Sequence, residues 1–340
     1  MTVSEKIKFG AKQAIVNCLR VKPSEKVCII TDEKTYHIGN AVKEEALKIT
    51  PNVKMFKMED FGERPDDGSN PLKLPDEIIR HVETCQVSIY VAQGKKGELQ
   101  TFRTPLIDGV VGRLKTIRHG HMIGTNDLIM ETGMNADYAK IQKMNAEIMG
   151  IVAGAKSAKM TAPAGTDLDI ELNPGWKWIN SDGVIGTDTW KNLPDGEVFT
   201  CVKNINGKMV VDGILGDFLS EKYGLIESTP LTIDIEEGWA KNFECTNNDI
   251  IKDVVEYSKM DKNASRIGEF GIGTNTGLTK LIGNLLQDEK FPGAHFSIGH
   301  GYPDKTGSDW NSEAHLDLVI QKTTIEIDGR TIMKDGKFCI

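Results

Sequence analysis

The chain has 340 residues, and its 41 Lys and Arg residues against 49 Asp and Glu residues give a formal net charge of −8. This excess of acidic residues argues against a protein that coats nucleic acid or an anionic membrane surface. Hydrophobic residues make up 39% and charged residues 26%, the balance of an ordinary globular protein, and no apolar run approaches the ~20 residues that a membrane-spanning helix needs.

The cysteines and the amino-terminal residues indicate a reducing compartment. The six cysteines lie far apart and form no Cys-x-x-Cys pair, which argues against a disulfide framework and against a thiolate zinc site. The opening residues, Met-Thr-Val-Ser-Glu-Lys, are not followed by the apolar segment of a secretory signal. We therefore expect a cytoplasmic protein with reduced thiols.

The first half of the chain alternates between helical and strand patterns. Apolar residues recur at helical spacing from Ile7 to Leu19, and Ser4 is the expected N-cap of that helix. The further predicted elements are strands over 26–31, 53–58 and 87–92 and helices over 38–49 and 75–82. Repeated βα units predict a parallel sheet covered by helices, and we expect this α/β domain to span residues 1–160.

Strand patterns dominate the second half. After a helix predicted over 138–155, strands are predicted over 167–172, 198–202, 209–211, 231–235, 295–298, 316–320 and 324–327. Only 249–259 and 277–286 are predicted to be helical. We expect residues 161–340 to form a second domain of mixed, strand-rich α+β structure.

A His-x-Asp pair begins one of these strands. Residues i and i+2 of a strand point to the same face, so His315 and Asp317 would project together while Leu316 and Leu318 face the other way. An imidazole and a carboxylate on one face can hold a divalent ion. A chance polar pair on a surface strand is the alternative for this pair alone.

A second histidine lies upstream, in the glycine-bounded stretch from Gly293 to Pro303. His295 begins a strand-like run, and it could be a metal ligand or a buried histidine bonded to a backbone carbonyl. Tyr302 precedes Pro303, which favours an extended backbone, and its phenol could reach a site or simply pack.

Two glutamates follow glycines and enter apolar stretches. Glu197 follows Gly196, and Glu269 follows Gly268. A carboxylate that heads a buried strand must be paired, hydrogen-bonded or metal-bound, whereas an exposed strand end is the simpler alternative for either residue alone. Together with the histidines, Asp317 and Tyr302, these residues could satisfy two divalent ions with one bridging carboxylate.

The order of these motifs resembles the M29 family of metalloaminopeptidases. The resemblance rests on blocks spread along most of the chain: Cys18 to Asp32, Gly165-Thr-Asp-Leu168, Asn192 to Thr200, Thr274 to Leu278, Asp288-Glu-Lys290, His295 to Pro303, and His315-Leu-Asp317. It implies metal ligands at Glu197, Glu269, His295, His315 and Asp317. It also implies catalytic roles for Glu269, as bridging ligand or general base, and for Tyr302, as a donor to the oxyanion.

The resemblance implies a two-metal aminopeptidase. The expected cofactors are two divalent ions (zinc, cobalt or magnesium), the expected substrate is a peptide that loses its N-terminal residues, and the expected assembly is a homodimer. Two other functions stay open. A similar group contains iron-dependent 2,5-dihydroxypyridine dioxygenases, whose chemistry His295, His315 and Asp317 could also support, and a protein that has lost catalysis could still bind a ligand.

Overall fold

The computed structural model of the protein describes residues 3–187 and 190–340. The chain forms two units with separate interiors: unit 1 comprises Met1–Ala139 and Gly183–Asp195, and unit 2 comprises Lys140–Asp182 and Gly196–Ile340. Each unit is described here by itself. The division into independent domains at residue 160 stays a prediction.

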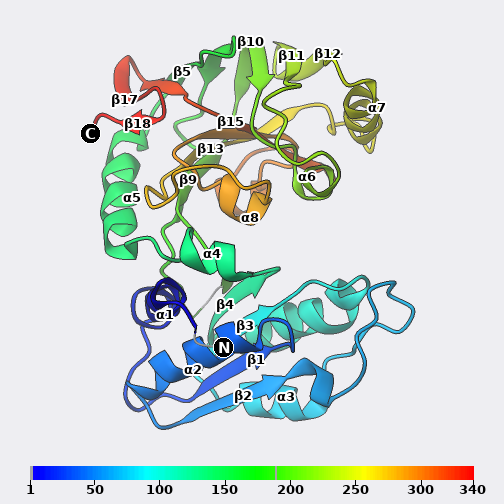
Figure 1. Ribbon diagram of the computed structural model, residues 1–340. Helices are drawn as coiled ribbons and strands as arrows, with labels where there is room; N and C mark the ends of the chain where they lie inside the picture. Colours follow the sequence, from blue (N-terminus) through cyan, green and yellow to red (C-terminus); the bar gives the residue numbers. More distant parts are fainter. Residues whose placement is uncertain (1–2, 188–189) are drawn as a thin grey trace. The chain divides into compact units, whose positions relative to one another are not determined.

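Unit 1 contains the predicted parallel sheet, in the order β2-β1-β3-β4-β8 (Figure 1). Its strands are β1 (Val27–Thr31), β2 (Val53–Lys57), β3 (Val87–Ala92), β4 (Arg118–Ile123) and β8 (Trp190–Asn192). Every residue of β1 and β3 is buried, as expected for parallel strands that are covered on both faces.

Helices cover both faces of this sheet. They are α1 (Glu5–Lys12), η1 (Gln13–Cys18), α2 (Tyr36–Leu47), η2 (Met58–Asp60), α3 (Asp76–Val82), η3 (Leu99–Arg103), η4 (Pro105–Gly112) and α4 (Asp127–Glu131). Ser4 caps α1 as predicted, because its hydroxyl accepts a 3.2 Å hydrogen bond from the backbone N–H of Ile7. Helices α3, η3 and η4 pack on the face that carries Cys28 and Ile30, whereas α2 approaches Thr31 on the other face.

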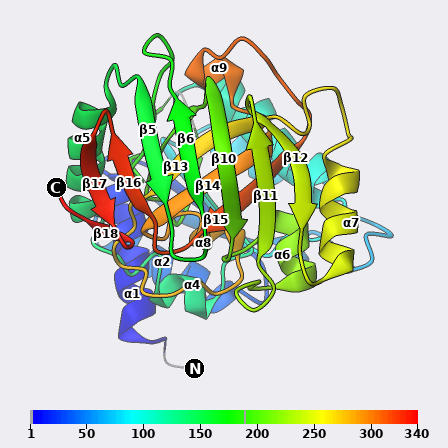
Figure 2. The ribbon, with the colours of Figure 1, turned by 90° about the horizontal axis from the view of Figure 1, so that it is seen from above.

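Unit 2 contains two antiparallel sheets (Figure 2). The eight-stranded sheet has the order β12-β11-β10-β6-β5-β16-β17-β18, and the five-stranded sheet has the order β15-β14-β13-β9-β7. Figure 2 shows the strands of the smaller sheet crossing beneath the larger one. One hydrophobic core contains side chains from both, among them Leu168 and Ile233 of the larger sheet and Phe270 and Phe296 of the smaller.

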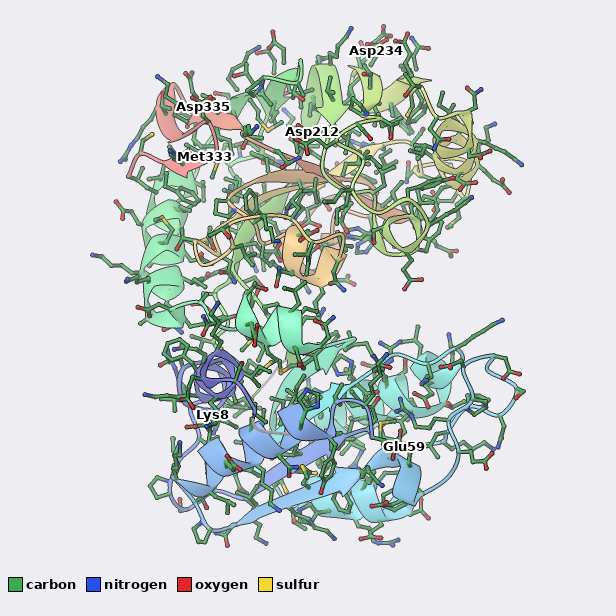
Figure 3. All side chains as sticks on the ribbon, in the orientation of Figure 1. Lys8, Glu59, Asp212, Asp234, Met333 and Asp335 are labelled. Carbon is green, nitrogen blue, oxygen red and sulfur yellow. The ribbon has the colours of Figure 1, made fainter. Side chains whose placement is uncertain are left out.

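The strands of the larger sheet are β5 (Ser157–Thr161), β6 (Asp167–Glu171), β10 (Asn204–Val211), β11 (Leu231–Glu236), β12 (Trp239–Glu244), β16 (Thr324–Ile327), β17 (Arg330–Lys334) and β18 (Lys337–Phe338). Those of the smaller sheet are β7 (Ile179–Ser181), β9 (Glu197–Cys201), β13 (Ile267–Gly273), β14 (Gly293–Gly299) and β15 (His315–Ile320). The helices are α5 (Tyr138–Val152), α6 (Asp217–Tyr223), α7 (Asn248–Tyr257), α8 (Leu285–Asp288) and α9 (Pro303–Thr306). The side chain of Asp234 lies on the outer side of the larger sheet, and Asp335 lies in the turn between β17 and β18 (Figure 3).

The fold class is as predicted, and the sequence patterns located most of the elements, but the helix predicted over 277–286 is wrong. Only α8 is helical there. The carboxylate of Asp288 accepts hydrogen bonds of 2.7–3.2 Å from the backbone N–H groups of Ile282, Gly283 and Asn284, and Gly283 has φ +77°. These bonds stabilise a loop in place of a helical ladder.

Within the described residues, none of the helices has the length and apolar character that a bilayer-spanning helix requires.

Candidate metal centre

Strand alternation divides β9, β13, β14 and β15 into a core face and a polar face. In the registers of these neighbouring strands, Gly271 pairs with His295, and Ser297 pairs with Asp317. The side chains of Val198, Phe270, Phe296 and Leu318, one from each strand, belong to the hydrophobic core. The opposite face carries Glu197, Glu269, His295, His315 and Asp317, because successive side chains of a strand alternate between its two faces.

A glycine makes room for the first imidazole. A Cβ atom built on Gly271 would lie 2.1 Å from both Cε1 and Nε2 of His295. The imidazole of His295 therefore lies directly against the backbone of β13, where no larger residue fits.

The polar face holds two groups of potential metal ligands, each with ligand atoms within 4.8 Å of one another. The first, called the His295 group, consists of Glu197, Glu289 and His295. The second, called the His315 group, consists of Glu269, His315 and Asp317. In the His295 group, Nε2 of the imidazole lies 3.4 Å from Oε2 of Glu197, and in the His315 group, Nε2 lies 3.3 Å from Oδ2 of Asp317.

Glu269 belongs to the His315 group and also faces His295 of the other group. Its Oε1 atom is 3.5 Å from Nε2 of His295, and its Oε2 atom is 3.7 Å from Nε2 of His315. The side chain is 5% exposed, so these two oxygens face the imidazoles and not solvent. A carboxylate with one oxygen toward each group has the position of a bridging ligand.

A buried ammonium group also lies in the His295 group. Nζ of Lys290 is 2.6 Å from Oε1 of Glu197 and 2.6 Å from Oε1 of Glu289, and the lysine side chain is 6% exposed. Lys290 thus neutralises part of the carboxylate charge of this group.

The orientation of His315 is fixed from two sides. Its Nδ1 atom lies 3.1 Å from the carbonyl oxygen of His300, so Nε2 faces the carboxylates and the Tyr302 hydroxyl, which is 3.3 Å away. A histidine that donates Nδ1–H to a carbonyl presents Nε2 as the ligand atom.

The extended backbone predicted for Tyr302 is wrong. Tyr302 has φ 53° and ψ 56°, in the left-handed region. Its carbonyl oxygen accepts hydrogen bonds of 2.9 Å from Lys305 N and 2.8 Å from Thr306 N, and this turn outweighs the preference that Pro303 imposes. A non-glycine residue in this conformation costs free energy and often marks a functional position.

The carboxylates control the protonation of both imidazoles. Burial opposes charging of His295, but Glu269 and Glu197 outweigh it and raise its pKa to about 9. Burial also opposes charging of His315, and Asp317 and Glu269 raise its pKa to about 10. Burial raises the pKa of Glu289 to about 8. The metal-free centre therefore holds protons that a divalent ion must displace.

Three orphaned buried atoms show that the centre fits a cation. Oε2 of Glu197, Oδ1 of Asp317 and Nδ1 of His295 are buried without a hydrogen-bond partner among the described residues. Unpartnered buried carboxylate oxygens are costly, and carboxylate and imidazole donors suit zinc, cobalt, manganese or iron.

The structure brings together all six residues singled out from the sequence, and it adds one that the sequence analysis missed. Glu289 was noted only as part of the Asp288-Glu-Lys290 block, and no strand alternation identifies it because it is the C-cap residue of α8. The roles of these residues as ligands or catalysts stay predictions.

The comparisons with known proteins agree on the fold. A family model described as thermophilic metalloprotease (M29) matches residues 127–338, more than half of the chain. No curated protein matches the chain.

Two solved structures are similar over nearly their whole length. One is 2,5-dihydroxypyridine dioxygenase from Pseudomonas putida KT2440, with a TM-score of 0.68, 16% identity, and coverage of 99% of this chain and 98% of that one. The other is wild-type AmpT from Thermus thermophilus, with a TM-score of 0.66, 14% identity, and coverage of 98% of this chain and 99% of that one. At these identities the likeness establishes the fold alone.

Proposed function

Because the chain belongs to the M29 family of thermophilic metalloproteases, we propose that it is a metal-dependent aminopeptidase that releases N-terminal residues from peptides. The observation that carries the proposal is the pair of largely buried ligand groups, with Glu269 of one group facing the histidines of both. Paired metal sites of this kind suit hydrolysis, since they can hold a carbonyl oxygen and a water molecule side by side.

Each ligand group would hold one divalent ion. Glu197, Glu289 and His295 would bind one ion, and His315 and Asp317 the other, with Glu269 shared. Bound zinc, cobalt or magnesium would supply Lewis acidity and lower the pKa of water toward neutrality.

Glu269 and Tyr302 have the reacting roles in this proposal. Glu269 would bridge the ions or take a proton from the attacking water, and burial raises its pKa as a general base requires. The Tyr302 hydroxyl, 3.3 Å from Nε2 of His315, would donate a hydrogen bond to the oxyanion that develops on the scissile carbonyl.

An iron-dependent dioxygenase is the second candidate, because the fold is equally similar to that of a 2,5-dihydroxypyridine dioxygenase. Such chemistry would use His295, His315 and Asp317 as three ligands of one iron. His295 belongs to a different ligand group from His315 and Asp317, and an iron triad has no need of Glu197 or Glu269. We therefore favour hydrolysis.

The test uses substrates that distinguish the two reactions. Leu and Arg amides with a free N-terminus should be cleaved without oxygen, and N-acetylation should block cleavage because an exopeptidase site must recognise the α-ammonium group. Glu269→Gln should remove nearly all hydrolysis, whereas the exposed Glu171→Gln should not.

Metal analysis completes the test. Protein with two zinc or cobalt ions per chain, inactive after chelation and restored by metal, would support the proposal. Three results together would favour the dioxygenase over the peptidase: one bound iron, oxygen uptake with a dihydroxylated pyridine in Glu269→Gln, and no peptide cleavage by the wild type.

We also propose that the enzyme is a cytoplasmic homodimer that acts on peptides. Light scattering of the purified full chain tests the dimer directly, and a monomer at micromolar concentration would contradict it.

A further inference from the structure

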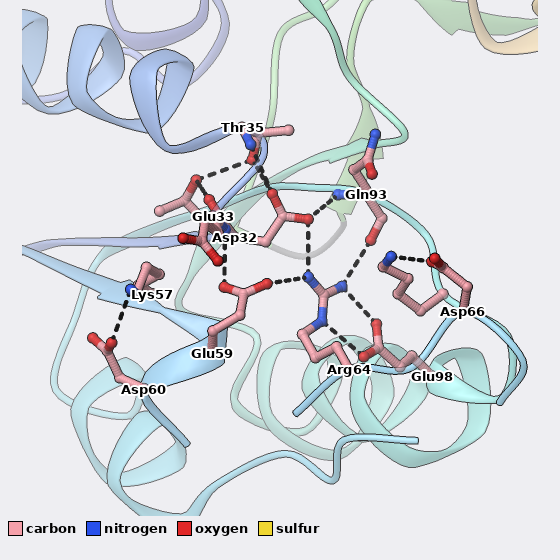
Figure 4. Close-up of polar contacts among 12 residues, drawn as sticks. Asp32, Glu33, Thr35, Lys57, Glu59, Asp60, Arg64, Asp66, Gln93 and Glu98 are labelled. Atoms are coloured by element: carbon pink, nitrogen blue, oxygen red, sulfur yellow. Dashed lines mark hydrogen bonds and ion pairs between the residues drawn. The ribbon is translucent and has the colours of Figure 1, made fainter. Parts of the chain in front are cut away.

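A buried arginine organises the carboxyl edge of the parallel sheet in unit 1 (Figure 4). The side chain of Arg64 is 2% exposed, and its Nη1 lies 2.9 Å from Oδ2 of Asp32, which follows β1. Its Nη2 lies 3.0 Å from the carbonyl oxygen of Gln93, which follows β3, and 2.7 Å from Oε2 of Glu98. Asp32 in turn accepts hydrogen bonds from the backbone N–H groups of Gln93 and Thr35.

These bonds fix the loops on both sides of a topological switch point. The connection from β1 leads through α2 to β2 on one side, and the connection from β3 leads to β4 on the other. In open parallel sheets, ligands bind outside the carboxyl ends of the strands at such a point.

A pocket of about 300 Å³ lies at this position. Its lining comes from the segments that follow three neighbouring strands: Lys34 and His37 after β1, Gln93 after β3, and Thr125 and Asp127 after β4. The volume is in the range of small-molecule sites.

The carboxylates at this edge are already engaged. Asp32, Glu59 and Glu98 share the guanidinium of Arg64, and Oδ1 of Asp127 lies 2.5 Å from Nε2 of His37. Because one guanidinium serves three carboxylates, an anion in the pocket depends on direct donors in the lining and not on the net charge of this edge.

Three features of the lining attract an anion. The amino terminus of the twelve-residue helix α2 has no acidic residue in its first turn, and its N-cap Thr35 makes no side-chain capping bond. The ammonium group of the exposed Lys34 forms no ion pair with any residue that the structure describes. Thr125 is fully buried, and its hydroxyl has no hydrogen-bond partner among the described residues.

We propose that this pocket of unit 1 binds the phosphate or carboxylate group of a small metabolite. The backbone N–H of His37 in the first turn of α2, the Lys34 ammonium and the Thr125 hydroxyl supply the donors. The N–H groups of Thr35, Tyr36 and Ile38 already donate to Asp32, Glu33 and Thr35. The inference is independent of the proposed peptidase activity, since all of these residues belong to unit 1.

The test follows the methyl groups of Ile38 and Leu128, which also line the pocket, by NMR of the full chain during titration with inorganic phosphate and, separately, with acetate. Saturable shifts of these methyls are expected with at least one anion. Lys34→Gln should weaken binding by roughly tenfold or more, and the control Lys43→Gln, which lies in α2 and outside the pocket lining, should not.

Thr125→Val provides a second measurement that does not depend on Lys34. Without ligand this variant should be at least as thermally stable as the wild type, because it removes an unpartnered hydroxyl, and it should lose the anion-induced shifts. Saturation by phosphate alone assigns a phosphate group, and saturation by acetate alone assigns a carboxylate. The absence of saturable shifts with both anions, or shifts that Lys34→Gln and Thr125→Val leave unchanged, would overturn the proposal.

Discussion

Among the described residues, Lys290 is the only lysine or arginine that forms a salt bridge with a carboxylate of the candidate metal centre. Its Nζ lies within 2.6 Å of carboxylate oxygens of both Glu197 and Glu289. Removal of one partner from a buried ion pair leaves uncompensated charge, which typically costs about 3–5 kcal/mol. A divalent ion at the same carboxylates would restore the missing positive charge.

Lys290→Met should therefore destabilise the metal-free protein by about 3 kcal/mol or more, and added zinc or cobalt should reduce the deficit. Urea unfolding with and without chelator measures both quantities. Lys203→Met is the matched control, since Lys203 and Glu171 form an exposed pair, with side chains 51% and 50% exposed, and such pairs contribute little. Equal stability of wild type and Lys290→Met under chelation would contradict this role.

Tyr302→Phe should leave metal content nearly unchanged but lower kcat by roughly 10²–10³, the usual effect of removing one oxyanion donor. The phenol contacts Nε2 of His315 at 3.3 Å, whereas the ring packs against Phe199 and would be kept. Elemental analysis and steady-state kinetics separate the two effects. Wild-type kcat in the variant would make Tyr302 a packing residue.

Sequence reasoning found the potential metal ligands that lie on strands and missed Glu289, which does not. His315 and Asp317 share a face because they are two residues apart on β15, and Glu197 and Glu269 stand at or near the starts of buried strands. Glu289 is at the end of a four-residue helix, where the side chain's direction depends on the loop that Asp288 holds. Local periodicity contains no information about that loop.

At the scale of elements, the approach of β13 to β14 determines the shape of the His295 group. Gly271→Ala would place Cβ 2.1 Å from the His295 ring, so the imidazole must move and metal affinity should fall, by roughly tenfold for each 1.4 kcal/mol lost. Isothermal titration with zinc measures the change. Gly150→Ala is the control in the same unit: it lies in α5, with no atom within 4 Å of the new Cβ, and should be neutral or stabilising. Unchanged zinc affinity in Gly271→Ala would show that the ring position does not matter.

The loop that follows β1 should make unit 1 sensitive to acid. Burial opposes ionisation of Asp32, but Arg64 and the N–H groups of Gln93 and Thr35 outweigh it and hold the pKa of Asp32 below its usual range. The depressed pKa means that this contribution to stability is present above about pH 3.9, the ordinary value, and is lost as pH falls through the lower folded-state value.

Asp32→Asn should accordingly lower the free energy of unfolding at pH 7, and the difference from wild type should shrink below about pH 3.9. Urea unfolding followed by a probe in unit 1 at several pH values measures this. Asp66→Asn is the control, because Asp66 is exposed and pairs with Lys95 at the surface. A deficit that stays constant as pH falls would show that the Asp32 charge is not responsible.

Buried strands and amphipathic helices were predictable because each carries its own pattern, but β4 was not predicted as a strand, and β13 was indicated only as the apolar stretch that Glu269 enters. The sequence of β4, Arg-His-Gly-His-Met-Ile, buries two histidines, and that of β13, Ile-Gly-Glu-Phe-Gly-Ile-Gly, contains three glycines. Both strands take their conformation from hydrogen bonds to neighbours, which override the low strand preference of these residues.

At the scale of the whole molecule, the sequence indicated the fold class but not the pairing of distant strands. The βα alternation predicts a parallel sheet, because such units connect locally. In the larger sheet of unit 2, β16 pairs with β5, although more than 150 residues separate them. Both strands show only an ordinary alternating pattern, so their partner is selected by the shared core and not by local sequence.

The last prediction concerns how metal binding distributes stability between the two units. Unit 2 contains four carboxylates in the candidate metal centre, those of Glu197, Glu269, Glu289 and Asp317. Bound divalent ions would remove the repulsion between them and add RT ln(1 + [metal]/Kd) to the stability of the state that binds. The units have separate hydrophobic cores. Zinc or cobalt should therefore raise hydrogen-exchange protection in β9, β13, β14 and β15, while protection in β1 and β3 changes little.

Exchange measured by mass spectrometry on metal-free and metal-loaded protein tests this, with His315→Ala as the control that should lose most of the added protection. An equal gain of protection in β1 and β3 would show that the units unfold together. No gain of protection in β13–β15 would contradict a metal centre on the polar face of the five-stranded sheet.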